Sequence, residues 1–228
     1  MSSKLLVAPL LALALPLMAA EADTQRLSES GKVLDEIMGA GDKAIPSDLF
    51  HKAYCVIVIP NMKKGGFMFS GKYGKGYATC RNPEGNGWTA PAAMRVEGGG
   101  FGLQVGGESA DIVMLVMSDK GMKGVLTSKF TLGGEASAAA GPVGRDATAQ
   151  TDATMKADIL SWSRSRGVFG GLSLQSGTLR ADEDGNKALY GKKENNTDIL
   201  TGKVKATSGA SVFLDPVAKY GGESRSSS

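Results

Sequence analysis

The stretch Gly65–Trp88 reads GGFMFSGKYGKGYATCRNPEGNGW, and it indicates the kind of fold that this chain adopts. Phe67, Phe69 and Tyr73 alternate with smaller or polar residues, which is the period of a strand with one covered face. The segment Asn82–Gly87 that follows is dense in turn-forming residues. The stretch therefore predicts a β-hairpin.

Further strands are expected on both sides of this hairpin. Cys55–Ile59 is a continuous apolar run that ends at Pro60, a pattern typical of a buried strand. Ile112–Met117 reads in the same way, and two more strands are expected at Ile159–Arg164 and Gly171–Leu179. The 32 glycines follow no fixed period, so we assign them to turns, bulges and close-packed positions of β structure.

Helices are expected mainly at the start of the chain. Apolar and small residues recur at helical spacing over Thr24–Met38, and Pro46 with Ser47 is a typical start of a second, short helix. A third helix is expected at Met122–Lys129. Because long helices do not alternate with apolar strands, we predict an α+β fold. It is a single domain with antiparallel β-sheet, an N-terminal helix and short peripheral helices.

The role of the helix at Thr24–Met38 has two interpretations. It packs against the fold, or it is an amphipathic segment that contacts a membrane. Its polar face mixes acidic with basic residues, unlike the basic face of typical surface-binding helices, and this favours packing.

The first 22 residues have the pattern of a secretory signal peptide. Lys4 precedes an apolar run over Leu5–Met18, and small residues suited to cleavage follow it. We expect a mature chain that begins near Glu21 or Asp23 and is periplasmic or secreted, with peripheral membrane association. An uncleaved anchor is the alternative, but the apolar run is shorter than the roughly 20 residues that a spanning helix needs.

The length that remains suits one domain, which we place at residues 23–201. Residues 202–228 are mainly small and polar and are expected to form a flexible tail. The formal net charge of +3 does not give the broad basic field that nucleic-acid binders use. Nucleic acid is therefore not expected as a partner.

Cys55 and Cys80 are the only cysteines, and His51 is the only histidine. The cysteines form a disulfide in an oxidising compartment, or they are two buried apolar thiols. Two sulfurs and one imidazole are too few ligands for a metal site. The chain also lacks the nucleophile and metalloprotease motifs of common hydrolases. We therefore expect no catalytic residues, no metal and no cofactor.

Two stretches look like ligand motifs and are interpreted otherwise. Gly66–Tyr73 satisfies Gly-x4-Gly-Lys, but Tyr73 replaces the hydroxyl residue that holds Mg²⁺ in a phosphate-binding loop. Asp182–Asn186 resembles the start of a calcium loop but lacks the rest of its spacing. We predict a strand for the first and a hairpin turn for the second.

Several blocks of this sequence, taken together, resemble the SYLF-domain family of lipid-binding proteins. They are Gly65–Trp88, Ala140–Arg145 and Ser161–Gly171, and the match runs from about Leu34 to Tyr190. The resemblance, to an exported bacterial member, implies a non-enzymatic protein that binds phospholipid at a membrane surface. The alternatives are an envelope module with a protein partner and no lipid ligand, or an unrecognised hydrolase.

Basic residues supply the candidate contacts to an anionic phospholipid membrane. Cations at Lys63 and Lys64 adjoin a glycine-flanked apolar segment, and this combination suits a peripheral lipid binder, although a solvated face is the ordinary alternative. Arg145 ends a rigid turn that holds a headgroup phosphate or only shapes the fold. Arg164 and Arg166 are expected to support a strand. The candidate lipid-binding residues are Lys63, Lys64, Phe67, Lys72, Lys75 and Arg145.

Overall fold

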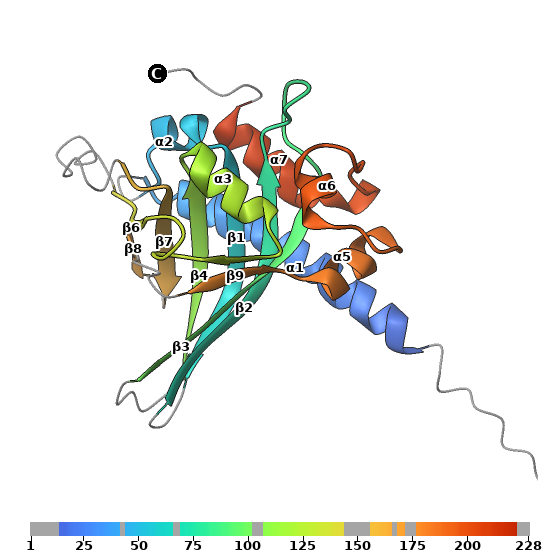
Figure 1. Cartoon of the computed structure of the whole chain (residues 1–228), viewed down its shortest axis with the longest axis horizontal. Coiled ribbons are helices and arrows are strands. Elements are labelled where there is room, and N and C mark those ends of the chain that lie inside the picture. The colour runs from blue at the N-terminus through green and yellow to red at the C-terminus, as the bar shows by residue number, and fades with distance from the viewer. Residues whose placement is uncertain are drawn as a thin grey trace, which may run out of the picture.

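The computed structural model describes residues 14–41, 44–65, 69–101, 107–143, 156–165, 168–171 and 177–222 (Figure 1). Its helices are α1 (Ala14–Met38), α2 (Ser47–Lys52), α3 (Asp119–Leu126), α5 (Glu183–Tyr190), α6 (Asn196–Leu200), the 3-10 helix η3 (Ser208–Ala210) and α7 (Ser211–Gly221). Its strands are β1 (Cys55–Gly65), β2 (Phe69–Cys80), β3 (Ala92–Phe101), β4 (Gly107–Val116), β5 (Lys129–Thr131), β6 (Ala138–Ala140), β7 (Ile159–Ser165), β8 (Val168–Gly171) and β9 (Thr178–Ala181).

A single curled sheet organises the fold. The nine described strands follow the order β5-β9-β3-β2-β1-β4-β7-β6, with β8 also paired to β7. Neighbours are antiparallel except β6 and β7, which run parallel. The predicted α+β class, a single domain with an antiparallel sheet and an N-terminal helix, is confirmed.

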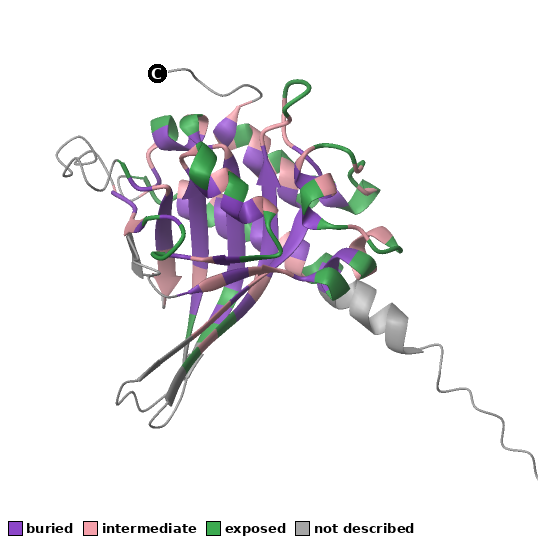
Figure 2. Cartoon of the chain, viewed as in Figure 1, coloured by how far each residue is buried: buried purple, intermediate pink, exposed green. Residues whose placement is uncertain are grey.

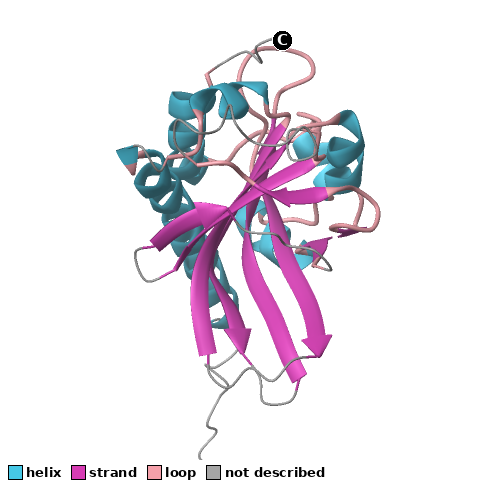
Figure 3. Ribbon diagram, turned by 90° about the vertical axis from the view of Figure 1, so that its left-hand side faces the viewer, coloured by secondary structure: helices cyan, strands magenta, loops and turns pink. Residues whose placement is uncertain are grey.

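Helices cover both faces of the sheet (Figure 3). One face packs against α1, α2 and α7, through side chains such as Leu34, Phe50 and Phe213. The other face packs against α3 and α6, through Val125 and Ile199. Figure 2 shows the resulting buried belt across the middle strands, while the far ends of β1 to β4 extend beyond the helices. None of the described helices combines the length and apolar character needed to cross a membrane.

Strand β1 lies in the middle of the sheet, between β2 and β4. Its residues Cys55–Ile59 are fully buried because alternate side chains enter the two opposite apolar clusters. This explains the continuous apolar run, and the predicted buried strand is confirmed. The hairpin predicted across the turn at Asn82–Gly87 is also present, with β2 and β3 as its strands.

The two cysteines lie directly opposite each other at the ends of β1 and β2. Cys55 pairs with Cys80 in the strand register, and a disulfide joins their sulfur atoms. Both residues are fully buried, so this bond lies within the apolar layer. It closes a loop that contains the whole β1–β2 hairpin.

The predicted flexible tail from residue 202 is wrong as far as Gly222. Helix α7 lies in this segment and buries Phe213 and Val217 against the sheet face covered by α1. Pro216 inside α7 has no N–H for the Val212 carbonyl, and that carbonyl faces Gly31 of α1. A side chain at Gly31 would lie 2.0 Å from this oxygen, so glycine permits the close contact of the two helices.

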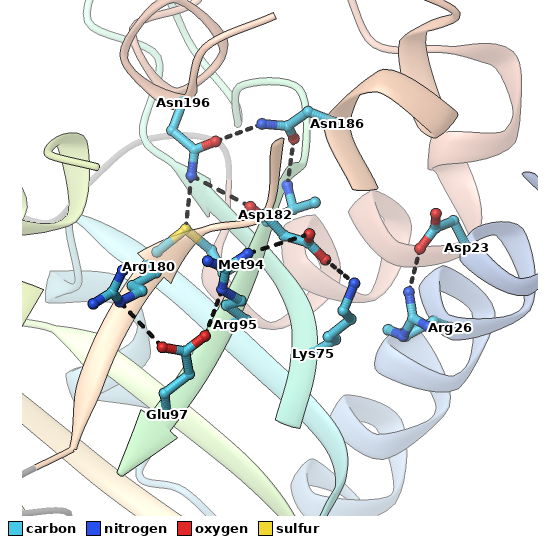
Figure 4. Close-up of polar contacts among 11 residues, drawn as sticks. Asp23, Arg26, Lys75, Met94, Arg95, Glu97, Arg180, Asp182, Asn186 and Asn196 are labelled. Atoms are coloured by element: carbon cyan, nitrogen blue, oxygen red, sulfur yellow. Dashed lines mark hydrogen bonds and ion pairs between the residues drawn. The ribbon is translucent and has the colours of Figure 1, made fainter. Parts of the chain in front are cut away.

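The predicted hairpin turn at Asp182–Asn186 is also wrong. Helix α5 begins at Glu183, directly after Asp182, and Asn186 is fully buried. The Asn186 side chain accepts a hydrogen bond from the Ala93 backbone and donates to Asn196, at 2.7 and 2.5 Å (Figure 4). These tertiary contacts hold α5 beside β3. The turn-forming residues of Asp182–Asn186 do not reveal them, because the partners Ala93 and Asn196 lie outside this segment of the sequence.

Candidate functional site

A groove of about 220 Å³ lies between α1 and the β1–β2 hairpin. We call it the basic groove, because three of its residues are cations. Its lining residues are Arg26, Glu29, Pro60, Asn61, Lys63, Tyr73, Gly74 and Lys75.

A bulge in β1 shapes this groove. The register of β1 shifts between Ile59 and Met62, and Asn61 adopts a φ of 50°, which asparagine tolerates better than most residues. The Asn61 backbone N–H donates to Asp111 at 2.9 Å, which fixes the bulge. Across the hairpin, a side chain at Gly74 would lie 2.6 Å from Ile59, so the glycine lets the bulged strand approach β2.

Asp111 is in turn held by Arg164. Arg164 donates to Asp111 through Nε and Nη2, and its Nη1 pairs with Glu36 of α1. Burial opposes the charge on Arg164, but the hydrogen bonds and charges of Asp111 and Glu36 outweigh it and raise the pKa of Arg164. Arg164 thus supports the sheet beneath the groove, as the sequence suggested, while Arg166 lies outside the described residues.

Lys63 and Tyr73 lie directly opposite each other on β1 and β2. Lys63 is exposed, and Tyr73 keeps 47% of its surface accessible, one of two large apolar side chains exposed in the described chain. Among the described residues, no ion pair is recorded for Lys63. The rim of the groove therefore combines an exposed cation, without an ion pair to any described side chain, with an exposed aromatic ring.

Lys75 has a different environment from the solvated cation expected for a lipid contact. Its Nζ lies 2.7 Å from the carboxylate of Asp182, which is only 2% exposed (Figure 4). Arg95 lies opposite Lys75 on β3, and its Nη1 is 3.9 Å from the same carboxylate. A buried carboxylate requires such cations, so most of the charge of Lys75 is compensated within the protein.

Further cations continue across the sheet from Lys75. The strand register places Lys75, Arg95, Arg180 and Lys129 opposite one another on β2, β3, β9 and β5. We call these four residues the cation row. Like charges on neighbouring strands repel one another, and Glu97 reduces this repulsion by lying between Arg95 and Arg180.

On the α1 side, the groove ends at a second charged pair. Arg26 pairs with Asp23 one helical turn earlier, and the Tyr77 hydroxyl donates to the Asp23 carbonyl oxygen at 2.9 Å. Burial, assisted by the negative charge of Asp23, raises the pKa of the Tyr77 phenol well above its ordinary range. Tyr77 therefore stays protonated. Its hydrogen bond to Asp23 holds α1 beside β2, next to the turn of α1 that lines the groove.

The other predicted site residues are distributed differently. Lys64 lies opposite Lys72 in the register, and the alternation of β2 turns Lys72 away from Tyr73 and the groove. Phe67 and Arg145 lie outside the described residues. Of the predicted set, the structure thus brings together Lys63 and Lys75.

Four charged residues of this surface were not among the predicted site residues: Asp182, Arg95, Glu97 and Arg180. Arg95 and Glu97 lie on one segment, and Arg180 and Asp182 lie more than eighty positions later. Taken alone, each of them looks like an ordinary charged surface residue. The alternation of Arg95 and Glu97 along one strand was the available signal, but it does not reveal which strand lies beside it.

Two other features of the described chain lack the properties of a binding site. A larger hollow, of about 550 Å³, lies beside Tyr190 and Lys205, but two of its lysines already pair with Glu194 and Asp198. Within the described residues, no group of three or more His, Cys, Asp or Glu side chains is arranged to hold a metal ion. The described chain is therefore an α+β domain in which the basic groove and the cation row gather cations and carboxylates beside one face of the sheet.

Comparison with known proteins identifies the family. The Ysc84 family, described as "Las17-binding protein actin regulator", matches residues 97–220. Protein YSC84 of Saccharomyces cerevisiae is 33% identical over 185 residues, which are 79% of this chain and 38% of the relative. LAS seventeen-binding protein 3 of the same species is 34% identical over 176 residues, 75% of this chain and 37% of the relative.

A human relative is similar to the same extent. SH3 domain-containing YSC84-like protein 1 of Homo sapiens is 31% identical over 162 residues, which cover 71% of this chain and 47% of that protein. The chain belongs to the Ysc84 family, whose shared domain is the SYLF domain. It spans less than half the length of each of these three relatives.

Proposed function

We propose that this chain binds anionic phospholipid surfaces without catalytic turnover, and that the basic groove makes the contact. One observation carries the proposal: Lys63 and Tyr73 are exposed and lie directly opposite each other at the rim of the basic groove. Tyrosine suits a membrane interface because its ring is apolar and its hydroxyl is polar. The lysine supplies attraction to anionic headgroups.

The magnitudes favour weak, reversible binding. A lysine near an anionic leaflet contributes about 1 kcal/mol, and salt screens this term within a Debye length of about 8 Å at physiological ionic strength. Because Asp182 and Asp23 compensate Lys75 and Arg26, Lys63 is the cation of the groove that has no ion-pair partner among the described residues, and Glu29 adds one negative charge to the lining. The interaction should therefore depend on salt and on several contacts acting together.

Vesicle flotation tests this function. The mature protein is mixed with phosphatidylcholine vesicles that either contain or lack phosphatidylglycerol, at low and at physiological salt. We expect flotation only with phosphatidylglycerol, and less of it at the higher salt concentration. A broad hydrolase screen on the same preparation should show no turnover. Failure to float with either vesicle at either salt concentration would reject the proposal.

We also propose that the chain is exported, to the periplasm or the medium. The signal-peptide pattern over residues 1–22 and the Cys55–Cys80 disulfide support this, because structural disulfides persist mainly in oxidising compartments. Intact mass of the exported protein should give a chain that begins near Glu21 or Asp23. A product that retains Met1 and stays with membranes after alkaline washing would contradict it.

A protein partner is the second candidate function. The names of the relatives support it, since the family is described as Las17-binding and two relatives are named for SH3 domains or Las seventeen binding. The partner for this chain would be a protein of the envelope. A wild-type protein that binds no vesicle would favour this function over the phospholipid one.

A further inference from the structure

Arg95 and Arg180 form a pair of guanidinium groups that enclose one carboxylate. They lie directly opposite each other on β3 and β9. Glu97 lies between them, with its two oxygens 2.7 Å from Arg95 Nε and 3.1 Å from Arg180 Nε (Figure 4). Two guanidiniums at this separation can hold an oxyanion, and here the carboxylate between them belongs to the protein itself.

The hydrogen bonding of this cluster is incomplete. Among the described residues, three buried side-chain atoms lack a hydrogen-bond partner, and all of them belong to this cluster: Arg95 Nε, Arg180 Nε and Asp182 Oδ1. The Nε atoms are close to Glu97, but their N–H groups are not aligned for a hydrogen bond with it. Buried groups in this state are uncommon and call for an explanation.

The two carboxylates of the cluster differ in how easily they can leave. Asp182 is 2% exposed and pairs with Lys75 and Arg95 from within the fold, so an anion from solvent cannot readily replace it. Glu97 is 36% exposed, and its partners Arg95 and Arg180 are 30% and 36% exposed. Ion pairs this close to solvent contribute little to stability, so a competing anion can displace Glu97 at little cost.

The arginine pair also adjoins the basic groove. Glu97 lies opposite Tyr73, and Arg95 lies opposite Lys75. Burial of Val96 and Leu179 in the apolar layer on one face turns Glu97, Arg95 and Arg180 toward the other face, where Tyr73 lies. A ligand at the rim of the groove therefore meets these arginines one strand further along.

We propose that Arg95 and Arg180 form an anion subsite that continues the basic groove, and that Glu97 occupies it as an internal competitor that a phosphate group displaces. This inference rests on the proposed function for its lipid ligand. When phosphate enters, the Glu97 side chain turns out to solvent, and phosphate oxygens accept hydrogen bonds from the two guanidiniums. No covalent bond changes. The same chemistry fits the phosphate of a lipid headgroup and free phosphate.

Glu97→Gln tests the internal competitor, because it removes the competing charge and keeps the shape of the side chain. Vesicles with and without phosphatidylglycerol serve as the lipid probe. We expect Glu97→Gln to bind the anionic vesicles roughly threefold to tenfold more tightly than the unmodified protein. Glu84→Gln is the matched control, since Glu84 is exposed on the turn after β2 and the change in net charge is identical. Its affinity should stay within about twofold of wild type.

A second variant locates the gain at the arginine pair. In Glu97→Gln with Arg180→Gln, the added affinity should disappear. If Glu97→Gln and Glu84→Gln bind equally while the wild type still binds anionic vesicles, the subsite is overturned and the phospholipid function stands.

A titration with inorganic phosphate shows whether the arginine pair binds free phosphate as well as a lipid headgroup, and it requires no variant. In the unmodified protein, the Nε–Hε NMR signals of Arg95 and Arg180 should shift as phosphate is added. Chloride at equal ionic strength should not shift them. If these NMR signals shift but the protein binds no vesicles, the arginine pair is a site for soluble phosphate, and the phospholipid function is rejected. No shift, together with no gain in Glu97→Gln, would overturn the subsite.

Discussion

Arg81 Nη1 donates a 2.7 Å hydrogen bond to the carbonyl oxygen of Gly222, 141 positions later in the chain. Its Nη2 donates to Gly221 and to His51, and Trp88 Nε1 donates to the same Gly222 oxygen. The guanidinium also lies 4.0 Å from the centre of the Trp88 ring. These contacts satisfy carbonyls at the end of α7 that the helix itself cannot satisfy, and they hold α7 on the sheet.

Replacing Arg81 should therefore destabilise the fold. We expect Arg81→Ala to lower the free energy of unfolding by about 2–3 kcal/mol, because hydrogen bonds to a charged donor are lost and the part-buried carbonyls of Gly221 and His51 lose that donor. Arg81→Lys should lose less, since it keeps the charge without the planar fork. Urea denaturation measures both. Lys205→Ala is the control, because it removes an exposed cation elsewhere and should leave stability unchanged. Equal stability of all three variants would contradict the proposed role of Arg81 in holding α7.

The rim of the groove should contribute to membrane binding in two distinguishable ways. Lys63→Ala should weaken binding to anionic vesicles about fivefold at low salt, and the effect should shrink as salt rises. Tyr73→Ala should weaken it by a factor that salt changes little, because the ring acts through apolar contact. Lys123→Ala, on the exposed side of α3, is the control. A loss in Lys123→Ala equal to that in Lys63→Ala would argue for a diffuse charge effect.

Gly76 is required for the pairing of β1 with β2. A side chain there would lie 1.9 Å from the Val58 carbonyl oxygen, which belongs to the backbone and cannot move aside cheaply. Gly76→Ala should cost about 1–3 kcal/mol or more of stability in thermal or urea unfolding. Gly209→Ala meets no atom within 4 Å in the 3-10 helix η3 and should be neutral or slightly stabilising. Similar stabilities for the two variants would disprove the steric argument.

Alkaline pH should destabilise the protein through Tyr77. Burial and Asp23 raise the pKa of this phenol above its ordinary value of 10.0, so the folded state holds the proton more tightly than the unfolded state. The stabilisation is complete below about pH 10 and is lost as pH rises further, when the unfolded chain ionises first. Tyr190 is shifted in the same direction by burial and Glu194.

Urea unfolding from pH 8 to pH 11 checks the role of Tyr77, since Tyr77→Phe should flatten part of the alkaline decline. At neutral pH this variant should also lose about 1 kcal/mol, because the hydrogen bond to Asp23 is gone. An unchanged alkaline slope in Tyr77→Phe would assign the decline to other groups.

The two cysteines should be unreactive in protein purified without reductant. Thiol titration of the denatured, unreduced protein should find no free thiol, because Cys55 and Cys80 are bonded. Replacing both with Ser should lower stability by about 2–4 kcal/mol. Two free thiols in the exported protein would contradict the bond.

Strong local patterns predicted much of the fold. The apolar run Cys55–Ile59 identified a strand that is buried on both faces, and alternation with a turn-rich segment identified the hairpin of β2 and β3. The helix predicted to end at Met38 does end there, although α1 begins at Ala14, before the predicted start at Thr24. These elements depend mainly on residues that are neighbours in the sequence.

The misses came from contacts between distant segments. Helix α7 contains Pro216 and lies among small polar residues, so only the spacing of Phe213, Val217 and Gly221 on its buried face could have revealed it. The charged cluster depends on the register of β3 with β9, which brings Arg95 opposite Arg180. No local pattern gives that register, and Lys75 therefore looked like a solvated cation although Asp182 compensates it.

The sheet order also determines when each part of the binding surface can form during folding. The β1–β2 hairpin that carries Lys63 and Tyr73 closes between neighbouring segments, and such local contacts form early. Arg180 reaches β3 only after a much longer loop has closed. We therefore expect the rim of the groove to assemble first and the arginine pair last. A folding intermediate in which β9 is undocked would expose Glu97 and Arg95 without their partner on β9.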